Sequence, residues 1–345
     1  MIFKLLHLLI ENYHEIYLLM IVPNFIPYEG QHCETTATGT LLKQLSINLS
    51  EPMLFGLGEG LGFIYWNMKM MDFPFLGGRI KPDVLTQNIA KNLGLTLRVQ
   101  ETSSKQKAWA TVKTLLDNRQ VVGLKLDCYH LDYFSKPIHF AGHYVAMYGY
   151  DTSHAFLVDT KQQGCLVKTS LDSLALARAE KGAMASPNLC YTLEKNDKSY
   201  PIEQVLRTAI KKNAHEYLNP PITNIGYKGI LKTSTELNKW FRASKNIEYE
   251  FTTAAMLMEK AGTGGALFRN LYRDFLKESY EILALPLLND VHEEFVEIAS
   301  LWTAVAELLD NVGKTQEEAY LDNAASLLVA ISIKEFQAMT KLAIL

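Results

Sequence analysis

The sequence predicts an α+β domain at residues 20–195, followed by an all-α domain at residues 196–345. Up to about Leu193, segments of helical period alternate with short apolar runs of strand length. Beyond the polar stretch Glu194–Pro201, nearly every segment has helical period alone. A chain of 345 residues is long enough for two domains of ordinary size, each with its own core.

The composition excludes several classes of function. Hydrophobic content of 48% with 21% charged residues is normal for a soluble globular protein. A net charge of -3 provides no basic field that would recruit nucleic acid or an anionic membrane surface. The cysteines form no CxxC pair and no zinc-finger spacing with histidines, so we expect reduced thiols in the cytoplasm, without a metal or disulfide scaffold. They are Cys33, Cys128, Cys165 and Cys190.

Residues 1–19 are predicted to be an N-terminal extension. Their apolar runs are broken by Glu11, His14 and Glu15, which leaves no stretch near the roughly 18 to 20 residues of a membrane span. No small-residue cleavage site follows the first run. We expect either an amphipathic helix that packs on the body or a translation start placed too early, with the true start at Met20.

The α+β domain begins with a helix at Cys33–Ser46, where Ala37, Leu41 and Leu45 recur at helical spacing. The glycine-rich stretch Gly56–Phe63 follows no strand of a βαβ unit, so we interpret it as a flexible loop near the site.

Turn and cap signals place the next elements. Gly77-Gly78 predicts a tight turn, and Asp83 can cap a helix that ends near Leu93, with Gly94 as its stop signal. Further helices are predicted at Ser104–Asn118 and Ser170–Lys181, with strands at 95–100, 121–129, 143–150, 155–160, 165–169 and 188–193.

The all-α domain is predicted as a bundle of five or six helices. Helical period covers 202–218, 231–243, 248–261, 266–283, 291–312 and 315 to the C-terminus. Apolar helix faces allow the bundle to serve as a lid, a carrier-protein dock or a homodimer interface, and the sequence leaves these open.

Cys33 is the best candidate nucleophile because it stands where a loop becomes a helix. The positive end of the helix dipole favours thiolate, which is the nucleophilic form. Flanking residues such as Gln31, His32 and Glu34 are polar, so a purely apolar role for this thiol is disfavoured.

His143 and Asp159 open and close two predicted strands of a hairpin centred on residue 151. An antiparallel pairing centred there places them directly opposite each other on one face. A carboxylate at that distance can fix the tautomer of an imidazole and orient it for catalysis. A purely structural histidine–aspartate bond is the alternative.

The order Cys33, His143, Asp159 is papain-like: the nucleophile helix comes first, and the strands with the base and its orienting carboxylate follow. Gln31 is the candidate oxyanion-hole side chain, together with the backbone N–H of Cys33. It lies closer to the cysteine than that pattern usually has it, and an exposed loop residue is the alternative.

Other residues are weaker candidates. Cys128 lies at the end of a buried strand and is interpreted as structural. His32 and Glu34, which flank Cys33, could contact substrate. Metal-binding, nucleotide-binding and serine-hydrolase motifs are absent. Arg79 could meet an acidic or phosphate group, or form a surface salt bridge.

A second glycine-rich segment lies in the helical half. Thr263, Gly264 and Gly265 end one predicted helix and begin the next, so free N–H groups there could bind an anion with Arg269 one turn on. A plain helix–helix corner is equally compatible.

Several segments together resemble a known family. GQHCETTATGTLL, PFLGGR, GLKLDCYHL, HFAGHYVAMYGYD and FLVDTKQQG resemble the N-terminal domain of the butirosin biosynthesis protein H family. GTGGALFRNLYRDFLKE resembles the domain of unknown function that accompanies it. The resemblance covers most of the chain from about Met20, and HCETT and AGHYVAMYGYD are its most specific parts.

This resemblance implies a papain-like fold and an acyltransferase in secondary-metabolite biosynthesis. The donor would be an acyl-phosphopantetheine thioester on a carrier protein, or a coenzyme A thioester, and no other cofactor is expected. Cys33 would accept the acyl group, His143 would activate the thiol and then the amine or hydroxyl acceptor, and Asp159 would orient His143. A cysteine hydrolase with the same triad and a non-catalytic binding module are the alternatives.

Overall fold

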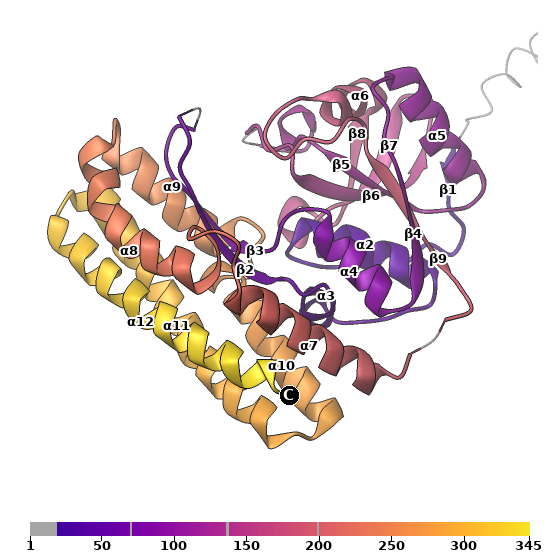
Figure 1. Ribbon diagram of the computed structural model, residues 1–345. Coiled ribbons are helices and arrows are strands. Elements are labelled where there is room, and N and C mark those ends of the chain that lie inside the picture. Colours follow the sequence, from indigo (N-terminus) through magenta and orange to yellow (C-terminus); the bar gives the residue numbers. More distant parts are fainter. Residues whose placement is uncertain (1–18, 70, 136–137, 199) are drawn as a thin grey trace, which may run out of the picture. The chain divides into compact units, whose positions relative to one another are not determined.

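The computed structural model describes residues 19–69, 71–135, 138–198 and 200–345 (Figure 1). It has an α+β N-terminal region with a mostly antiparallel sheet and an all-helical C-terminal region. The predicted α+β class with a helical C-terminal part is therefore confirmed. The helix or early start expected before Met20 lies outside the described residues.

The chain forms two compact units made of interleaved segments. The first contains residues 1–29, 36–47 and 98–192, and the second contains residues 30–35, 48–97 and 193–345. The sequence predicts consecutive domains instead, and their bounds stay a prediction.

A seven-stranded sheet has the order β4-β9-β5-β6-β7-β8, and β1 also pairs with β6. The strands are β1 (Met20–Ile21), β4 (Leu95–Gln100), β5 (Val122–Leu126), β6 (His143–Tyr150), β7 (His154–Val158), β8 (Leu166–Ser170) and β9 (Cys190–Lys195). Every residue of β5 is buried, as its apolar sequence predicts for a strand with neighbours on both sides. Edge strand β8 alternates exposed and less exposed positions and carries Lys168, which discourages further pairing.

The N-terminal half of the chain also contains helices. They are α2 (Cys33–Gln44), α3 (Glu51–Leu57), α4 (Val84–Asn92), α5 (Lys105–Asp117) and α6 (Leu171–Ala179). Ser104 and Ser170 cap α5 and α6 through their hydroxyl oxygens. Asp83 makes no side-chain cap to α4, so that expectation is wrong. Instead, a carboxylate oxygen of Glu34 accepts the Thr86 N–H in the first turn, at 3.2 Å.

The glycine-rich stretch Gly56–Phe63 is not the flexible loop we expected. It ends α3 and enters strand β2 (Leu61–Trp66), and all its residues are buried. A Cβ on Gly56 would lie 2.1 Å from the ring of Phe275, so glycine is present because the neighbouring ring occupies that space.

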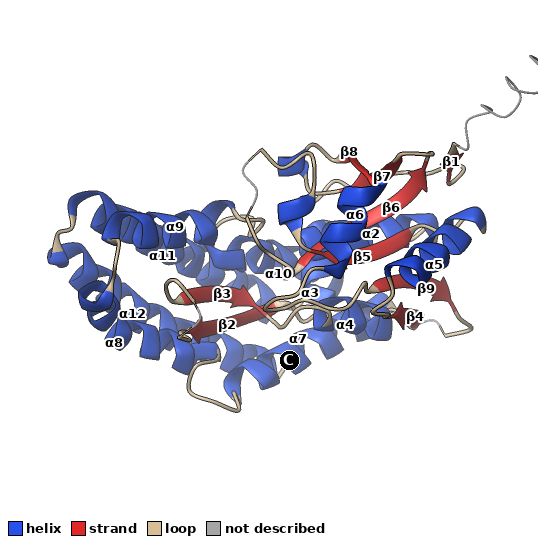
Figure 2. Cartoon of the chain, turned by 90° about the horizontal axis from the view of Figure 1, so that it is seen from above, coloured by secondary structure: helices blue, strands red, loops and turns tan. Residues whose placement is uncertain are grey.

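The Gly77-Gly78 pair is likewise not a turn. Both residues lie inside strand β3 (Phe75–Arg79), which pairs with β2 in an antiparallel hairpin (Figure 2). A Cβ on Gly78 would lie 2.2 Å from the Leu267 carbonyl oxygen. The two glycines therefore allow close packing, and the turn interpretation failed because it considered only backbone freedom.

The C-terminal region consists of long helices at the predicted places, although α8 and α11 each begin five residues earlier than predicted. They are α7 (Ile202–Leu218), α8 (Gly226–Ala243), α9 (Ile247–Lys260), α10 (Arg269–Leu283), α11 (Pro286–Thr315) and α12 (Glu318–Ala343), with a short 3₁₀ turn at Ala266–Phe268 before α10. Their core includes the fully buried side chains of Trp302, Phe275 and Phe295. Among the described residues, no helix is long and apolar enough to cross a membrane.

Candidate active site

His143 and Asp159 form a hydrogen bond in the first compact unit. The Nε2 atom of His143, the first residue of β6, lies 2.8 Å from Oδ2 of Asp159, which directly follows β7. The predicted direct opposition is wrong, because Ala146 pairs with Val158 and the ladder shifts between Met147 and Gly149. Continuing that register leaves Asp159 diagonal to His143 on the same face, close enough for the predicted contact.

Asp159 is fully buried and held by further donors. The Tyr133 hydroxyl donates to the same Oδ2 atom at 2.7 Å, and the Thr160 N–H donates to Oδ1 at 2.6 Å. Burial and the adjacent carboxylate raise the pKa of Tyr133 well above its ordinary value, so its hydroxyl stays a donor. These contacts fix the carboxylate that holds the imidazole.

The contact with Asp159 determines which nitrogen of the His143 ring carries the proton. An ionised carboxylate only accepts hydrogen bonds, so Nε2 carries the proton in the neutral ring and Nδ1 carries the lone pair. Phe134 packs edge-on against the ring, with centroids 5.5 Å apart. Sequence reasoning missed Tyr133 and Phe134, because two aromatic residues in a loop carry no spacing signal that links them to His143.

Cys33 is the first residue of α2, in agreement with its predicted place at a helix N-terminus. The preceding loop is held by the Glu51 carboxylate, which accepts the N–H groups of Gln31 and His32 at 2.9 and 2.8 Å. The Thr35 hydroxyl donates to the same carboxylate at 2.8 Å. Gln31 is exposed and His32 is buried. An oxyanion role for Gln31 and a substrate contact for His32 remain predictions.

Glu34 and Arg79 are paired with each other. Arg79 Nη1 lies 2.9 Å from Oε2 of Glu34, and the Thr86 hydroxyl donates to Oε1 at 3.0 Å. Burial raises the pKa of Glu34, and Arg79 and Thr86 oppose that rise. The acidic partner expected for Arg79 is thus Glu34. Both side chains are thus engaged within the protein beside the start of α2, and a substrate contact by either stays a prediction.

Cys128 is poorly suited to nucleophilic attack, although its electrostatic environment includes His143 and Asp159. Its thiol donates to the Ile138 carbonyl oxygen at 3.3 Å. Burial raises its pKa to about 11, with His143 opposing the rise. A thiol with so high a pKa carries little thiolate at neutral pH.

The predicted anion site in the helical half uses its donors internally. The Gly265 N–H donates to the Thr263 hydroxyl oxygen at 3.1 Å, and the Ala266 N–H donates to Glu259 at 3.0 Å. Gly264 contributes its carbonyl oxygen to Asn270.

Arg269, the cation expected at that site, is itself fully buried. Its Nε and Nη2 atoms lie 2.8 and 2.9 Å from the Glu335 carboxylate. We therefore assign no anion to this corner.

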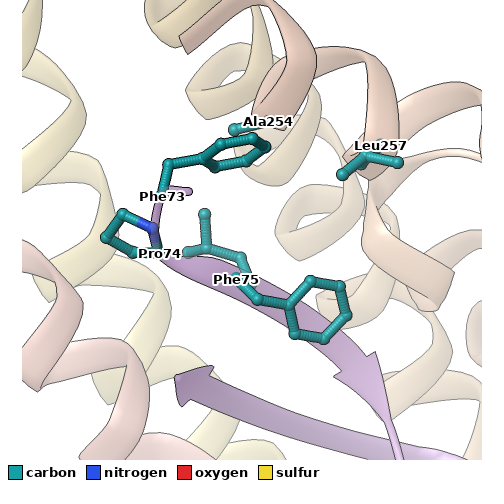
Figure 3. Close-up of a pocket in the computed structure, with 6 residues that line it drawn as sticks. Phe73, Pro74, Phe75, Ala254 and Leu257 are labelled. Carbon is teal, nitrogen blue, oxygen red and sulfur yellow. The ribbon is translucent and has the colours of Figure 1, made fainter. Parts of the chain in front are cut away.

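Two cavities differ in what they could hold. The apolar one in Figure 3, between the Phe73–Leu76 segment and helix α9, measures about 10 Å³, which is no more than the space for one water. A cavity of about 320 Å³ in the first unit is lined by Asp127, Phe140, Glu180 and Met184 among others. Its lining includes Ala141, which stands two residues before His143 in the sequence. Among the described residues, no three His, Cys, Asp or Glu side chains are grouped to hold a metal ion.

Comparison with known families accounts for most of the chain. Residues 32–160 match the N-terminal model of butirosin biosynthesis protein H, and residues 172–342 match a domain of unknown function, DUF4872. No curated protein matches the chain. The chain therefore matches the arrangement of these two domains that its sequence predicts. The match indicates an enzyme related to biosynthesis.

Proposed function

We propose that the protein is an acyltransferase with a papain-like Cys33–His143–Asp159 triad. It would move an acyl or aminoacyl group from a carrier-protein or coenzyme A thioester to an amine or hydroxyl acceptor. The observation that carries the proposal is the buried His143–Asp159 hydrogen bond at 2.8 Å. Support comes from the family match, because all three residues lie within the matched range 32–160.

The first half of the proposed reaction forms an acyl-enzyme. His143 Nδ1 takes the proton of the Cys33 thiol, and the thiolate attacks the carbonyl carbon of the donor thioester. The bond between that carbon and the donor sulfur breaks, and the departing sulfur takes the proton from the imidazolium. The acyl group is then a thioester of Cys33, and the carrier thiol is free.

The second half transfers the group. The acceptor amine or hydroxyl attacks the acyl carbon, and His143 removes its proton. The bond to the Cys33 sulfur breaks, and the thiolate recovers its proton from the imidazolium. Asp159 orients the ring in both halves and stabilises its charged form.

The cavity of about 320 Å³ is the candidate acceptor site. Its size lies at the lower end of the range for small-molecule sites, and its lining mixes apolar Phe140 and Met184 with the carboxylates of Asp127 and Glu180. Carboxylates favour an acceptor that carries a protonated amine. Lys181 in the same lining would disfavour a dense positive charge.

Intact mass spectrometry with acyl-pantetheine surrogates tests the nucleophile. We expect one acyl adduct on the wild-type chain and none on Cys33→Ala. An adduct on both chains, or on neither, would overturn the assignment of Cys33.

A chase experiment separates transfer from hydrolysis. The isolated acyl-enzyme is mixed with small primary amines or with buffer alone, and the products are measured by mass. Faster loss of the adduct with amine, together with an acylated amine, supports transfer. Loss at the same rate in both, with only free acid formed, would make the protein a hydrolase.

A further inference from the structure

The segment Gly262–Phe268 packs directly against the loop that precedes Cys33. Both belong to the second compact unit. A Cβ on Gly262 would lie 3.1 Å from the Gln31 carbonyl oxygen and 3.8 Å from the His32 Cα, so the two backbones are in close contact. The Phe268 ring meets the His32 ring edge-on, with centroids 5.3 Å apart.

This segment has an unusual backbone. Ala266, Leu267 and Phe268 have φ values of 49°, 47° and 74°, and they follow Gly264 and Gly265 at 69° and 83°. Left-handed conformations are strained for residues with a Cβ, and three in succession persist only where the surroundings hold them. A plain helix–helix corner could be built from the glycines alone, without placing three further residues in this region.

The surroundings do hold the segment. Arg269 Nη1 donates to the carbonyl oxygens of Leu267 and Gly78 at 2.8 and 3.1 Å, while the rest of its guanidinium pairs with the buried Glu335. The Phe268 ring also stacks on Phe55, with centroids 5.5 Å apart. The strained turn is thus clamped from one side and presents Phe268 toward His32.

We infer that the Gly262–Phe268 turn is a positioning element for the nucleophile, so that the reactivity of Cys33 depends on this part of the C-terminal region. Phe268 acts through the buried ring of His32, and Gly262 acts through the backbone of Gln31. The turn thereby sets the loop from which α2 and its first residue, Cys33, begin. This inference rests on the proposed role of Cys33 as the nucleophile.

The rate of Cys33 alkylation by iodoacetamide, followed by peptide mass spectrometry, tests the inference. We expect Phe268→Leu to slow alkylation about tenfold or more, since an ångström-scale misplacement of a reacting group costs up to roughly 10²-fold. Phe295→Leu is the comparison variant: it removes another buried ring, which packs on Tyr272. It should lower the melting temperature similarly and leave the alkylation rate unchanged.

A glycine pair gives a second test. Gly262→Ala adds a Cβ at a φ of +71°, 3.1 Å from a backbone oxygen of the nucleophile loop. Gly94→Ala adds one at a φ of +67°, also 3.1 Å from a backbone oxygen, that of Lys198. Both variants should lose stability, but only Gly262→Ala should slow the alkylation of Cys33 and shift its pH dependence.

The outcomes are distinguishable. If wild-type Cys33 reacts no faster than free cysteine, the proposed nucleophile itself fails. If wild-type Cys33 is fast, and Phe268→Leu and Gly262→Ala match it while remaining folded, the positioning role is wrong. If Phe295→Leu and Gly94→Ala slow alkylation as much as their partners, the effect is general destabilisation and the inference also fails.

Discussion

Glu34 and Arg79 form an ion pair immediately after the candidate nucleophile, with Nη1 and Oε2 2.9 Å apart. The carboxylate is fully buried, and the guanidinium is nearly so. Because Glu34 also accepts from Thr86, this one carboxylate joins the start of α2 to β3 and to the first turn of α4. The pair neutralises a buried negative charge at the residue that follows Cys33.

Replacement of Arg79 should therefore lower the stability of the fold. Arg79→Met leaves a buried carboxylate without its counter-charge, and we expect a loss of about 3 kcal/mol in the free energy of unfolding, measured in urea. The Glu34→Gln/Arg79→Met double variant should recover part of this loss. A matched surface pair, Lys113–Asp117, should give a change near zero when Lys113 is replaced by Met.

The loss should also depend on pH. Glu34 has a raised pKa in the folded state, so folding favours its protonated form, and stability falls as pH rises from the ordinary value of 4.5 toward the folded pKa. Removal of Arg79 raises the pKa of Glu34 further, so the pH range over which stability falls extends to higher pH. The deficit of Arg79→Met should thus shrink at pH below 4.5. A deficit that grows on acidification would contradict the assignment.

Tyr133 should tune the proposed pair of His143 and Asp159. Tyr133→Phe removes one donor from Oδ2 of Asp159, so the carboxylate interacts more strongly with His143 and stabilises its imidazolium. We expect the acidic limb of the pH–rate profile for acyl-enzyme formation to move to higher pH, with a stability loss of about 1 kcal/mol. Tyr150→Phe offers a matched comparison, because that hydroxyl donates to Asp117 at 2.6 Å. The pH–rate profile of Tyr150→Phe should stay unchanged. An equal shift in the profiles of Tyr133→Phe and Tyr150→Phe would contradict the role of Tyr133.

The sequence predicted elements well where one local signal decided them. Strands β4 and β6 and helix α7 have the predicted bounds, because alternation, apolar runs and helical period are properties of the segment itself. The contact between His143 and Asp159 was also predictable, although the shift in the ladder after Met147 was not. Such a shift depends on neighbouring strands and the turn together.

The failures concern residues whose role is set by distant partners. The sequence predicted Gly56 in a loop and Gly78 in a turn. In the structure they make room for Phe275 and Leu267, which lie about two hundred residues further along the chain. We interpreted Arg269 as an anion ligand because its partner, Glu335, lies in another helix and carries no signal near Arg269 in the sequence. A single sequence shows which residues are unusual but not which distant residue makes them so.

Cys128 should be dispensable for acylation. A pKa of about 11 leaves roughly one thiol in a thousand ionised at pH 8, and the thiol donates to Ile138 instead. We expect Cys128→Ala to retain the acyl adduct and to lose about 1 kcal/mol of stability from the small cavity. Adduct formation is followed by intact mass, beside Cys33→Ala. If Cys128→Ala loses the adduct while the chain remains folded, Cys128 would replace Cys33 as the assigned nucleophile.

Arg269 should behave as a core residue of the helical region. Its guanidinium pairs with Glu335, which also accepts from Trp302 Nε1 at 2.7 Å and from the Tyr217 hydroxyl. Arg269→Met strands a buried carboxylate, so we expect a loss of about 3 to 5 kcal/mol in the free energy of unfolding. Arg273→Met removes a half-exposed pair with Asp274 and should cost almost nothing.

A double-mutant cycle with Glu335→Gln measures how strongly the two buried charges are coupled. We expect the double variant to be much less destabilised than the sum of the single variants, because each single change leaves the other group buried and uncompensated. An anion-binding Arg269 predicts a different pattern. Arg269→Met would then cost little in plain buffer, and added phosphate or sulfate would stabilise the wild type but not the variant. That pattern in urea denaturation would support an anion site at Arg269. It would also contradict the role of Arg269 in holding the turn at Gly262–Phe268.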